Sequence, residues 1–323
     1  MVSRANELRV EAGSAIGDRL NPVFRKGILV ATNNSAMQRF VYRYGMRLGA
    51  SRFVAGESLE EAVPVLKQLN ARKLRVNTTI LGEGVSDAAK ANAVTDQYAE
   101  VLQRLIDEQI DGNVALKLTH LGLTFDTELA YANIERLVKH AAERGAFIRI
   151  DMEESARVDD TLAIYKRLRE AGYDNVGTVL QSYLFRTEHD LRDLIPYKPN
   201  LRLVKGAYLE PESIAFSQKS DVDRNYIKLA DTMLEHNSFT AIATHDSSLI
   251  DHVKERQNAG EAGPFEFQML YGIRPQYQLD LVEQGHRVLV ATPYGPDWYY
   301  FLMRRLAERP ANVLFFAKNV VKR

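Results

Sequence analysis

Two cations, a glycine and an aromatic residue end one apolar segment of the chain, and this run is the one best suited to chemistry. It reads Arg202-Leu203-Val204-Lys205-Gly206-Ala207-Tyr208. Arginine and lysine rarely enter a buried strand unless a partner neutralises them. Two of them at a strand end therefore predict an anionic or electron-rich ligand above that strand. The alternative is a surface strand whose two cations extend into water.

The rest of the chain predicts elements that would position this run. Short apolar segments, typical of buried strands, alternate with amphipathic segments, typical of helices. We predict strands at residues 74–81, 113–119, 146–152, 176–183, 201–208, 240–245, 265–270 and 287–292. Helical patterns lie between them at residues 87–109, 128–144, 159–171, 222–236 and 248–258.

Eight β–α units favour an α/β fold of the (β/α)8, TIM-like barrel type. An open doubly wound sheet would usually carry a glycine-rich first turn, and the sequence has neither G-x-G-x-x-G nor G-x-x-x-x-G-K-[ST]. We predict a single domain over residues 1–323, with N-terminal helical additions at 1–73, the barrel at 74–308 and a C-terminal tail at 309–323.

Composition excludes several classes of function. The chain has 42 basic and 42 acidic residues, and no basic run that would favour nucleic acid. It has no cysteine, which excludes disulfides, thiolate nucleophiles and iron–sulfur clusters. No apolar stretch reaches the roughly 18 residues of a membrane span, and the N-terminus lacks a signal-peptide pattern. We expect a cytoplasmic protein with at most a peripheral contact at the inner face of the membrane.

In such a barrel the chemistry lies at the carboxyl ends of the strands. The predicted strands end there in polar residues, among them Lys117, Asp151, Gln181, Lys205, His245 and Gln268. Three readings stay open. Schiff-base chemistry, as in a lyase or aldolase barrel, would use Lys117 or Lys205 as the amine. A metal centre would need closely spaced ligands, and no H-x-H or H-E-x-x-H occurs, so we predict none. A non-enzymatic binding module would need fewer polar strand ends.

Adjacent arginines near the C-terminus supply the sharpest signal for a small ligand. Arg304 and Arg305 follow an aromatic cluster in a predicted helix. Two planar guanidinium groups bind a carboxylate through paired hydrogen bonds. The alternative is the solvated basic face of a surface helix.

Five segments together resemble the FAD-dependent proline dehydrogenases, most closely the monofunctional bacterial type. They are the run at residues 202–208, Ile150-Asp151-Met152-Glu153-Glu154, Ala243-Thr244-His245, Phe265-Glu266-Phe267-Gln268 and Arg304-Arg305-Leu306-Ala307-Glu308. Their order and spacing match over roughly residues 45 to 310. The resemblance implies a distorted (β/α)8 barrel whose last helix lies over the barrel mouth.

The resemblance also implies roles for individual residues. Asp151 and Arg202 would be catalytic, with Arg202 near the flavin N5. The FAD-binding positions would be Met152, Gln181, Arg202, Val204, Lys205, Gly206, Ala207, Thr244 and His245. The substrate-binding positions would be Lys117, Tyr208, Leu270, Arg304 and Arg305, with Glu83 as a gate carboxylate.

The activity implied is oxidation of L-proline to Δ1-pyrroline-5-carboxylate, the first step of proline degradation. Electrons would pass from FAD to a quinone, and a pyrroline-5-carboxylate dehydrogenase would be a downstream partner. One position departs from the family pattern: many members carry a tyrosine in strand eight where Ala291 stands here. A smaller wall at Ala291 puts in doubt how strictly proline is preferred over hydroxyproline.

Overall fold

The computed structural model of the chain describes residues 39, 42–46, 49–82, 85–236, 238–299 and 301–303. The chain divides into two compact units. One is Val63–Pro293, and the other combines Met1–Ala62 with Tyr294–Arg323. The domain boundaries expected at residues 73 and 308 stay predictions.

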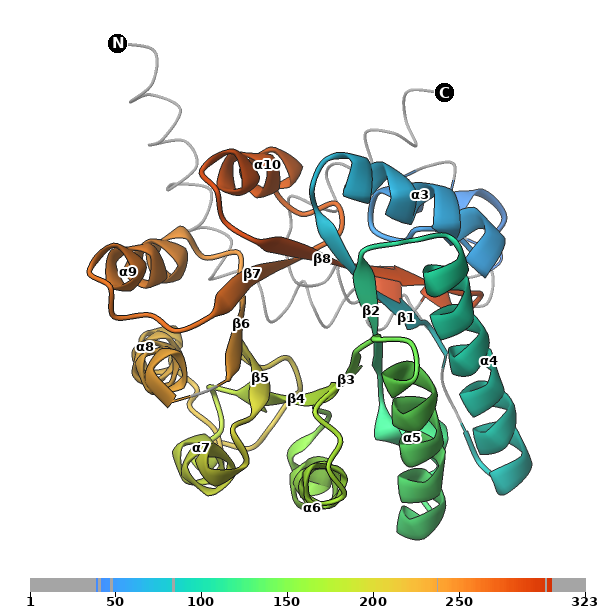
Figure 1. Ribbon diagram of the computed structural model, residues 1–323, viewed down its shortest axis with the longest axis horizontal. Helices are drawn as coiled ribbons and strands as arrows, with labels where there is room; N and C mark the ends of the chain where they lie inside the picture. Colours follow the sequence, from blue (N-terminus) through green and yellow to red (C-terminus); the bar gives the residue numbers. More distant parts are fainter. Residues whose placement is uncertain are drawn as a thin grey trace. The chain divides into compact units, whose positions relative to one another are not determined.

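The unit Val63–Pro293 is built around a closed barrel of eight parallel strands in chain order. Figure 1 shows the strands arranged in a ring, with helices α4 to α10 on the outside of that ring. The strands are β1 (Arg75–Ile80), β2 (Gly112–Leu116), β3 (Ile148–Ile150), β4 (Val176–Gln181), β5 (Asn200–Val204), β6 (Phe239–Ala243), β7 (Phe265–Leu270) and β8 (Val288–Tyr294). All eight predicted strands, and the predicted barrel, are therefore confirmed.

The α-helices alternate with these strands. They are α3 (Leu59–Ala71), α4 (Ala88–Asp107), α5 (Thr127–Ala142), α6 (Val158–Glu170), α7 (Thr187–Leu194), α8 (Lys219–His236), α9 (Ser247–Asn258) and α10 (Pro275–Glu283). The five predicted helical ranges correspond to α4, α5, α6, α8 and α9. The short α7 and α10 were not among them, because eight or nine residues hold barely two turns of periodicity.

Local side chains explain where several helices begin and end. The Asp87 carboxylate accepts a hydrogen bond from the Lys90 backbone amide at 2.9 Å, which caps the first turn of α4. The Ser58 hydroxyl accepts one from the Glu61 amide at 3.3 Å at the start of α3. Gly172, just beyond α6, has a φ of 89°, the left-handed conformation that ends a helix without a Cβ clash.

The two faces of the barrel sheet have opposite chemistry. Outward-facing residues such as Val114, Ile148 and Leu203 are apolar and fully buried beneath the helices. Inward-facing residues are largely polar: Arg202 on β5 reaches Asn77 on β1 and Gln268 on β7. Hydrogen bonds between strands that are not neighbours must cross the lumen. The barrel therefore encloses a hydrogen-bonded polar network where most such barrels pack branched aliphatic residues.

Gly177 makes room for one charge of this network. Arg149 is 1% exposed, and its guanidinium donates to the backbone oxygens of Thr178 at 2.9 Å and Asn200 at 2.8 Å. A Cβ on Gly177 would lie 2.4 Å from the Arg149 Nη1 atom and 2.4 Å from the Asn200 oxygen. Burial, and then the charge of Arg202, lower the pKa of Arg149 to about 9, so it stays charged at neutral pH.

The described part of the second unit is held by aromatic contacts. The Trp298 indole donates to the Glu57 carboxylate at 2.7 Å. Tyr42 stacks on Tyr299, with ring centroids 5.3 Å apart, and meets Trp298 edge-on at 5.5 Å. Most of the helix predicted around residues 297–308 lies outside the described residues, so its place relative to the barrel stays a prediction.

Replacing Gly177 tests the close packing around Arg149. We expect Gly177→Ala to lower the free energy of unfolding by about 1–3 kcal/mol, because the new methyl group forces a buried guanidinium and a carbonyl apart. Gly82→Ala is the matched control, since a Cβ there has no atom within 4 Å. Urea unfolding of both variants measures the difference. Equal stabilities would contradict the close approach.

Candidate active site

The Arg202 guanidinium is the central group at the carboxyl end of the barrel lumen. It donates from Nε to Gln268 Oε1 at 2.5 Å, from Nη1 to Asp151 Oδ1 at 2.7 Å and from Nη2 to Asn77 Oδ1 at 3.1 Å. The Arg202 residue is only 8% exposed. Three acceptors from three other strands thus hold this buried charge in one orientation.

The structure brings the two predicted catalytic residues, Asp151 and Arg202, into direct contact. Asp151 forms an ion pair with Arg202, with 2.7 Å between Oδ1 and Nη1. The catalytic roles of both residues stay predictions.

Lys117 lies at the same level as Asp151 on the neighbouring strand. Leu116 is in register with Ile150, so the next residues of both strands, Lys117 and Asp151, face the lumen together. Within the described part of the chain, no hydrogen bond or ion pair to the Lys117 ammonium is found.

Two titratable groups near Lys117 respond to burial and to its charge. Burial, and then the Lys117 ammonium, lower the pKa of His120 to about 4, which keeps the imidazole neutral at pH 7. Burial raises the pKa of Glu153, while the Lys117 charge opposes that rise. Glu153 accepts from the Thr119 hydroxyl at 2.8 Å.

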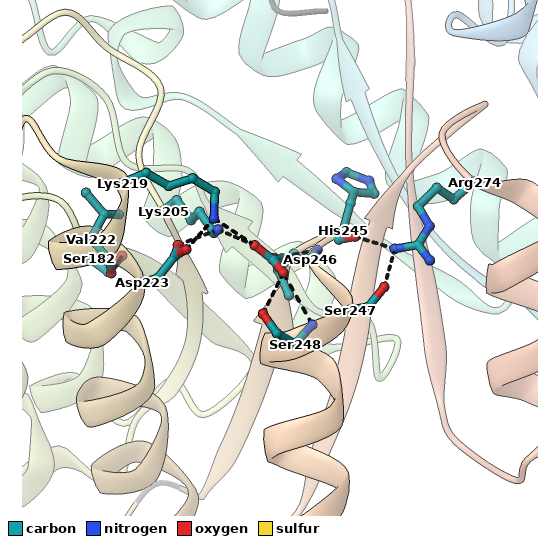
Figure 2. A network of polar contacts seen from close by, with 11 residues as sticks. Ser182, Lys205, Lys219, Val222, Asp223, His245, Asp246, Ser247, Ser248 and Arg274 are labelled. Atoms are coloured by element: carbon teal, nitrogen blue, oxygen red, sulfur yellow. Dashed lines mark hydrogen bonds and ion pairs between the residues drawn. The ribbon is translucent and has the colours of Figure 1, made fainter. Parts of the chain in front are cut away.

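Lys205 lies beyond the end of β5, between two carboxylates. Its ammonium lies 2.5 Å from Asp223 Oδ1 on α8 and 2.8 Å from Asp246 Oδ2 ahead of α9. Lys219, at the start of α8, contacts the same two carboxylates. Figure 2 shows Asp246 reaching both lysines and also Ser248 at the beginning of α9. This four-residue cluster joins β5, α8 and α9.

The cluster changes the charge state of Asp246. Burial acts to raise the pKa of this carboxyl, but hydrogen bonds from Lys205 and Ser248, with the charges of Lys205 and Lys219, outweigh it. The pKa of Asp246 is therefore held well below its ordinary value.

Gly206, just after β5, packs tightly against the Tyr183 ring. Its φ is 117°, and a Cβ there would lie 2.2 Å from that ring. Only glycine fits this place without displacing the ring. The position of Tyr183 and the course of the backbone after β5 therefore depend on each other.

The other predicted cofactor positions lie around the same edge of the barrel. Gln181 ends β4 and donates to the Glu153 backbone oxygen at 2.8 Å. The His245 Nε2 atom accepts from the Leu270 amide at 2.9 Å, and the Thr244 hydroxyl accepts from the Asp246 amide at 3.1 Å. Met152 and Thr244 are buried, at 7% and 6% exposure, and Ala207 is exposed. Their roles stay predictions.

The strand register also places two wall positions. Leu270 on β7 is paired with Ala291 on β8, so their side chains point to the same face of the sheet. Gln268, two residues before Leu270, faces the lumen, and the alternation of side chains puts Leu270 and Ala291 on that face too. The small Ala291 side chain thus leaves space at the lumen wall. Tyr208 follows Gly206 in the loop after β5 and is half-buried.

Three of the predicted site residues fall outside the described ranges, and two unpredicted residues contact the site. Glu83, Arg304 and Arg305 lie outside the described residues, so their roles stay predictions. The sequence reasoning missed Asn77 and Asp223 as partners of Arg202 and Lys205. Asn77 could have been found, because it stands two residues after Arg75 and so lies on the same face of the strand. Asp223 gave no such signal, because it lies among the polar surface residues of a helix.

In the described part of the chain, no three His, Asp or Glu side chains gather closely enough to hold a metal ion. The described helices likewise include none with the length and apolar character needed to cross a bilayer.

A closed parallel barrel with a fixed guanidinium and polar side chains at the carboxyl ends of its strands has the arrangement of a TIM-like barrel enzyme. A family model described as Proline dehydrogenase matches residues 62–318. Proline dehydrogenase 2 of Bacillus subtilis (strain 168) is 40% identical over 303 residues, 93% of this chain and 100% of that protein. Proline dehydrogenase of Deinococcus radiodurans is 39% identical over 309 residues, 94% and 99% of the two chains. The chain belongs to the proline dehydrogenase family.

More distant relatives are longer proteins. Bifunctional protein PutA of Escherichia coli (strain K12) is 27% identical over an alignment 365 positions long, which covers 98% of this chain but 26% of PutA. A crystal structure of proline utilization A from Bdellovibrio bacteriovorus shares the fold, with a TM-score of 0.77 at 24% identity over 88% of this chain and 36% of that one. The chain is an enzyme more similar to the shorter proline dehydrogenases of Bacillus and Deinococcus than to PutA.

The charge cluster at Lys205 predicts how stability depends on pH. A carboxyl whose pKa is lowered by folding stabilises the fold above its unfolded pKa, about 3.9 for Asp. That contribution is lost as the pH falls through the folded pKa. Asp246→Asn keeps a side-chain oxygen that caps α9 but removes the charge. We expect it to cost about 1–2 kcal/mol at pH 7.

Urea unfolding of the wild type and Asp246→Asn between pH 8 and pH 3 measures this difference. It should be constant down to about pH 4 and shrink below it. The matched control is Asp251→Asn, because Asp251 is 58% exposed and 3.8 Å from its lysine partner; we expect an effect below about 0.5 kcal/mol. A difference that grows as the pH falls would have the wrong sign.

Proposed function

We propose that the chain oxidises L-proline to Δ1-pyrroline-5-carboxylate, with FAD as cofactor and a quinone as the final electron acceptor. One observation carries the proposal: Arg202 is held by three hydrogen bonds at the carboxyl end of a barrel whose family relatives are named proline dehydrogenases. The reaction is the first step of proline degradation.

The residues at this edge of the barrel suit a flavin. Gly206 lets the backbone after β5 turn beside the Tyr183 ring, which fixes the loop that follows Lys205. Met152, Gln181, Val204, Lys205, Gly206, Ala207, Thr244 and His245 would hold the cofactor. Bound FAD supplies the acceptor for the hydride that leaves the ring carbon beside the proline nitrogen. Arg202 supplies a fixed positive charge toward the electron-rich reduced form.

The remaining residues bind and prepare the substrate. Lys117 has an ammonium without a described partner, which suits the proline carboxylate. We propose that Arg304 and Arg305 also bind this carboxylate. Tyr208 and Leu270 would form walls of the substrate pocket, and Glu83 would act as its gate. A hydride leaves only from the neutral amine, and alkylammonium groups titrate near ~10. Nearby cations disfavour a second positive charge and so favour loss of the amine proton.

The Schiff-base alternative is less well supported by the geometry. A nucleophilic amine must be uncharged. The Lys205 amine is already engaged in ion pairs with the Asp223 and Asp246 carboxylates. Lys117 keeps this alternative open to experiment.

An absorption spectrum tests the proposed function. We expect the purified protein to be yellow, to lose its flavin absorbance when L-proline is added without oxygen, and to regain it with a water-soluble quinone. If the protein is yellow but proline does not bleach it, L-proline is not its substrate. A colourless protein that borohydride and a carbonyl compound modify at Lys117 would instead establish the Schiff-base alternative.

Two substitutions of Asp151 test its contact with Arg202. Asp151→Ala removes an acceptor from a buried guanidinium, a loss of about 1.5–3 kcal/mol. We therefore expect kcat with proline to fall roughly 10- to 100-fold while flavin stays bound. Asp151→Asn should be milder, because its amide oxygen still accepts from Arg202 Nη1. Near-wild-type turnover of Asp151→Ala would exclude the proposed role.

A further inference from the structure

The amide of Gln268 lies between two charged side chains in the barrel lumen. Its Oε1 atom accepts from Arg202 Nε at 2.5 Å, and its Nε2 atom donates to Glu266 Oε1 at 2.7 Å. A guanidinium only donates hydrogen bonds, and a carboxylate only accepts them. If the amide were reversed, its NH2 group would face the Arg202 donor and its oxygen would face the Glu266 carboxylate. The two charges therefore fix the orientation of the amide.

Glu266 is the buried end of this link. It is 2% exposed, and its second oxygen accepts from Arg75 Nη1 at 2.9 Å. Arg75 in turn donates from Nε to Asp111 Oδ1 at 2.8 Å, and the Asp111 side chain is 64% exposed. A continuous chain of hydrogen bonds thus runs from the amino-terminal rim of the barrel to Arg202. Burying a carboxylate this deeply is costly unless its partners are well placed.

We propose that Glu266 is a positioning residue for the oxidation reaction, acting on Arg202 through Gln268. This inference rests on the proposed function, in which Arg202 faces the cofactor. The bond from Nε to Gln268 is the third fixed point of the guanidinium, beside the bonds of its two Nη atoms to Asp151 and Asn77. Glu266 holds Nε indirectly, since it determines which end of the Gln268 amide faces Arg202.

The substitution Glu266→Gln removes the charge that orients the Gln268 amide, without changing the size of the side chain. The new amide cannot accept from both Gln268 and Arg75 through one oxygen while its own NH2 group also finds an acceptor. We expect kcat to fall about tenfold, the loss of roughly 1.4 kcal/mol of stabilisation. KM should change little, because Glu266 contacts no substrate position.

The flavin midpoint potential supplies a readout that a purely structural role would not move. Tenfold weaker stabilisation of the reduced cofactor lowers a two-electron potential by about 30 mV. Holoenzyme is titrated against a reference dye for the wild type, Glu266→Gln and Asp111→Asn. Asp111→Asn is the matched acid-to-amide control, because it alters the far side of Arg75 and leaves the bond between Glu266 and Gln268 in place.

The expected result is a lower potential and kcat in Glu266→Gln alone. Wild-type values in Glu266→Gln, with or without a lower melting temperature, would overturn the proposal. So would equal losses in Asp111→Asn. Should Glu266→Gln fail to fold, Gln268→Met removes the same link with an apolar side chain of similar length. It must then show the lower potential for the proposal to stand.

Failure of this inference differs from failure of the proposed function. Arg202→Lys keeps the charge but loses the planar fork. If Arg202→Lys lowers the flavin potential and Glu266→Gln does not, only the role of Glu266 is wrong. If the protein binds no flavin, or Arg202→Lys leaves the potential unchanged, the proposed function is at fault.

Discussion

The burial of one guanidinium determines much of this barrel. Arg202 is 8% exposed, so its donors must be matched by acceptors from within the lumen. Asn77 on β1, Asp151 just after β3 and Gln268 on β7 supply them. Each of these strands must keep its register, because a shift by one residue would turn the acceptor to the outer face. The charge thus specifies the alignment of strands that are not neighbours.

A polar lumen moves the hydrophobic core to the outside of the sheet. The apolar side chains of the strands, such as Leu116 and Ile150, are fully buried on the helix-facing side. Burial of this layer supplies the main favourable contribution to folding. The lumen contributes orientation instead: satisfied networks of this kind are rigid, whereas a partly satisfied one is costly. The outer face of the sheet therefore contributes most of the stability, and the inner face determines the geometry of the site.

The sequence was sufficient for the architecture and for part of the site. Eight alternating segments predicted the barrel because strand and helix periods differ clearly along the chain. The carboxyl-end positions of Asp151, Gln181 and Lys205 followed from that topology. The partners could not be predicted in the same way. Which side chains meet across a lumen depends on register and tilt, so the contact of Arg202 with Asn77, 125 residues away, carries no local signal.

The four-residue cluster of Lys205, Lys219, Asp223 and Asp246 has a consequence for how the barrel can diversify. It joins the end of β5 to the beginning of α8, on either side of the loop between residues 205 and 219. A second tie lies within that loop, where the Phe216 amide donates to the Tyr183 oxygen at 2.8 Å. Because both ends are anchored, insertions at the exposed Leu209 would lengthen the loop at small entropic cost. The mouth of the barrel can thus acquire new surface during evolution while Lys205 keeps its place.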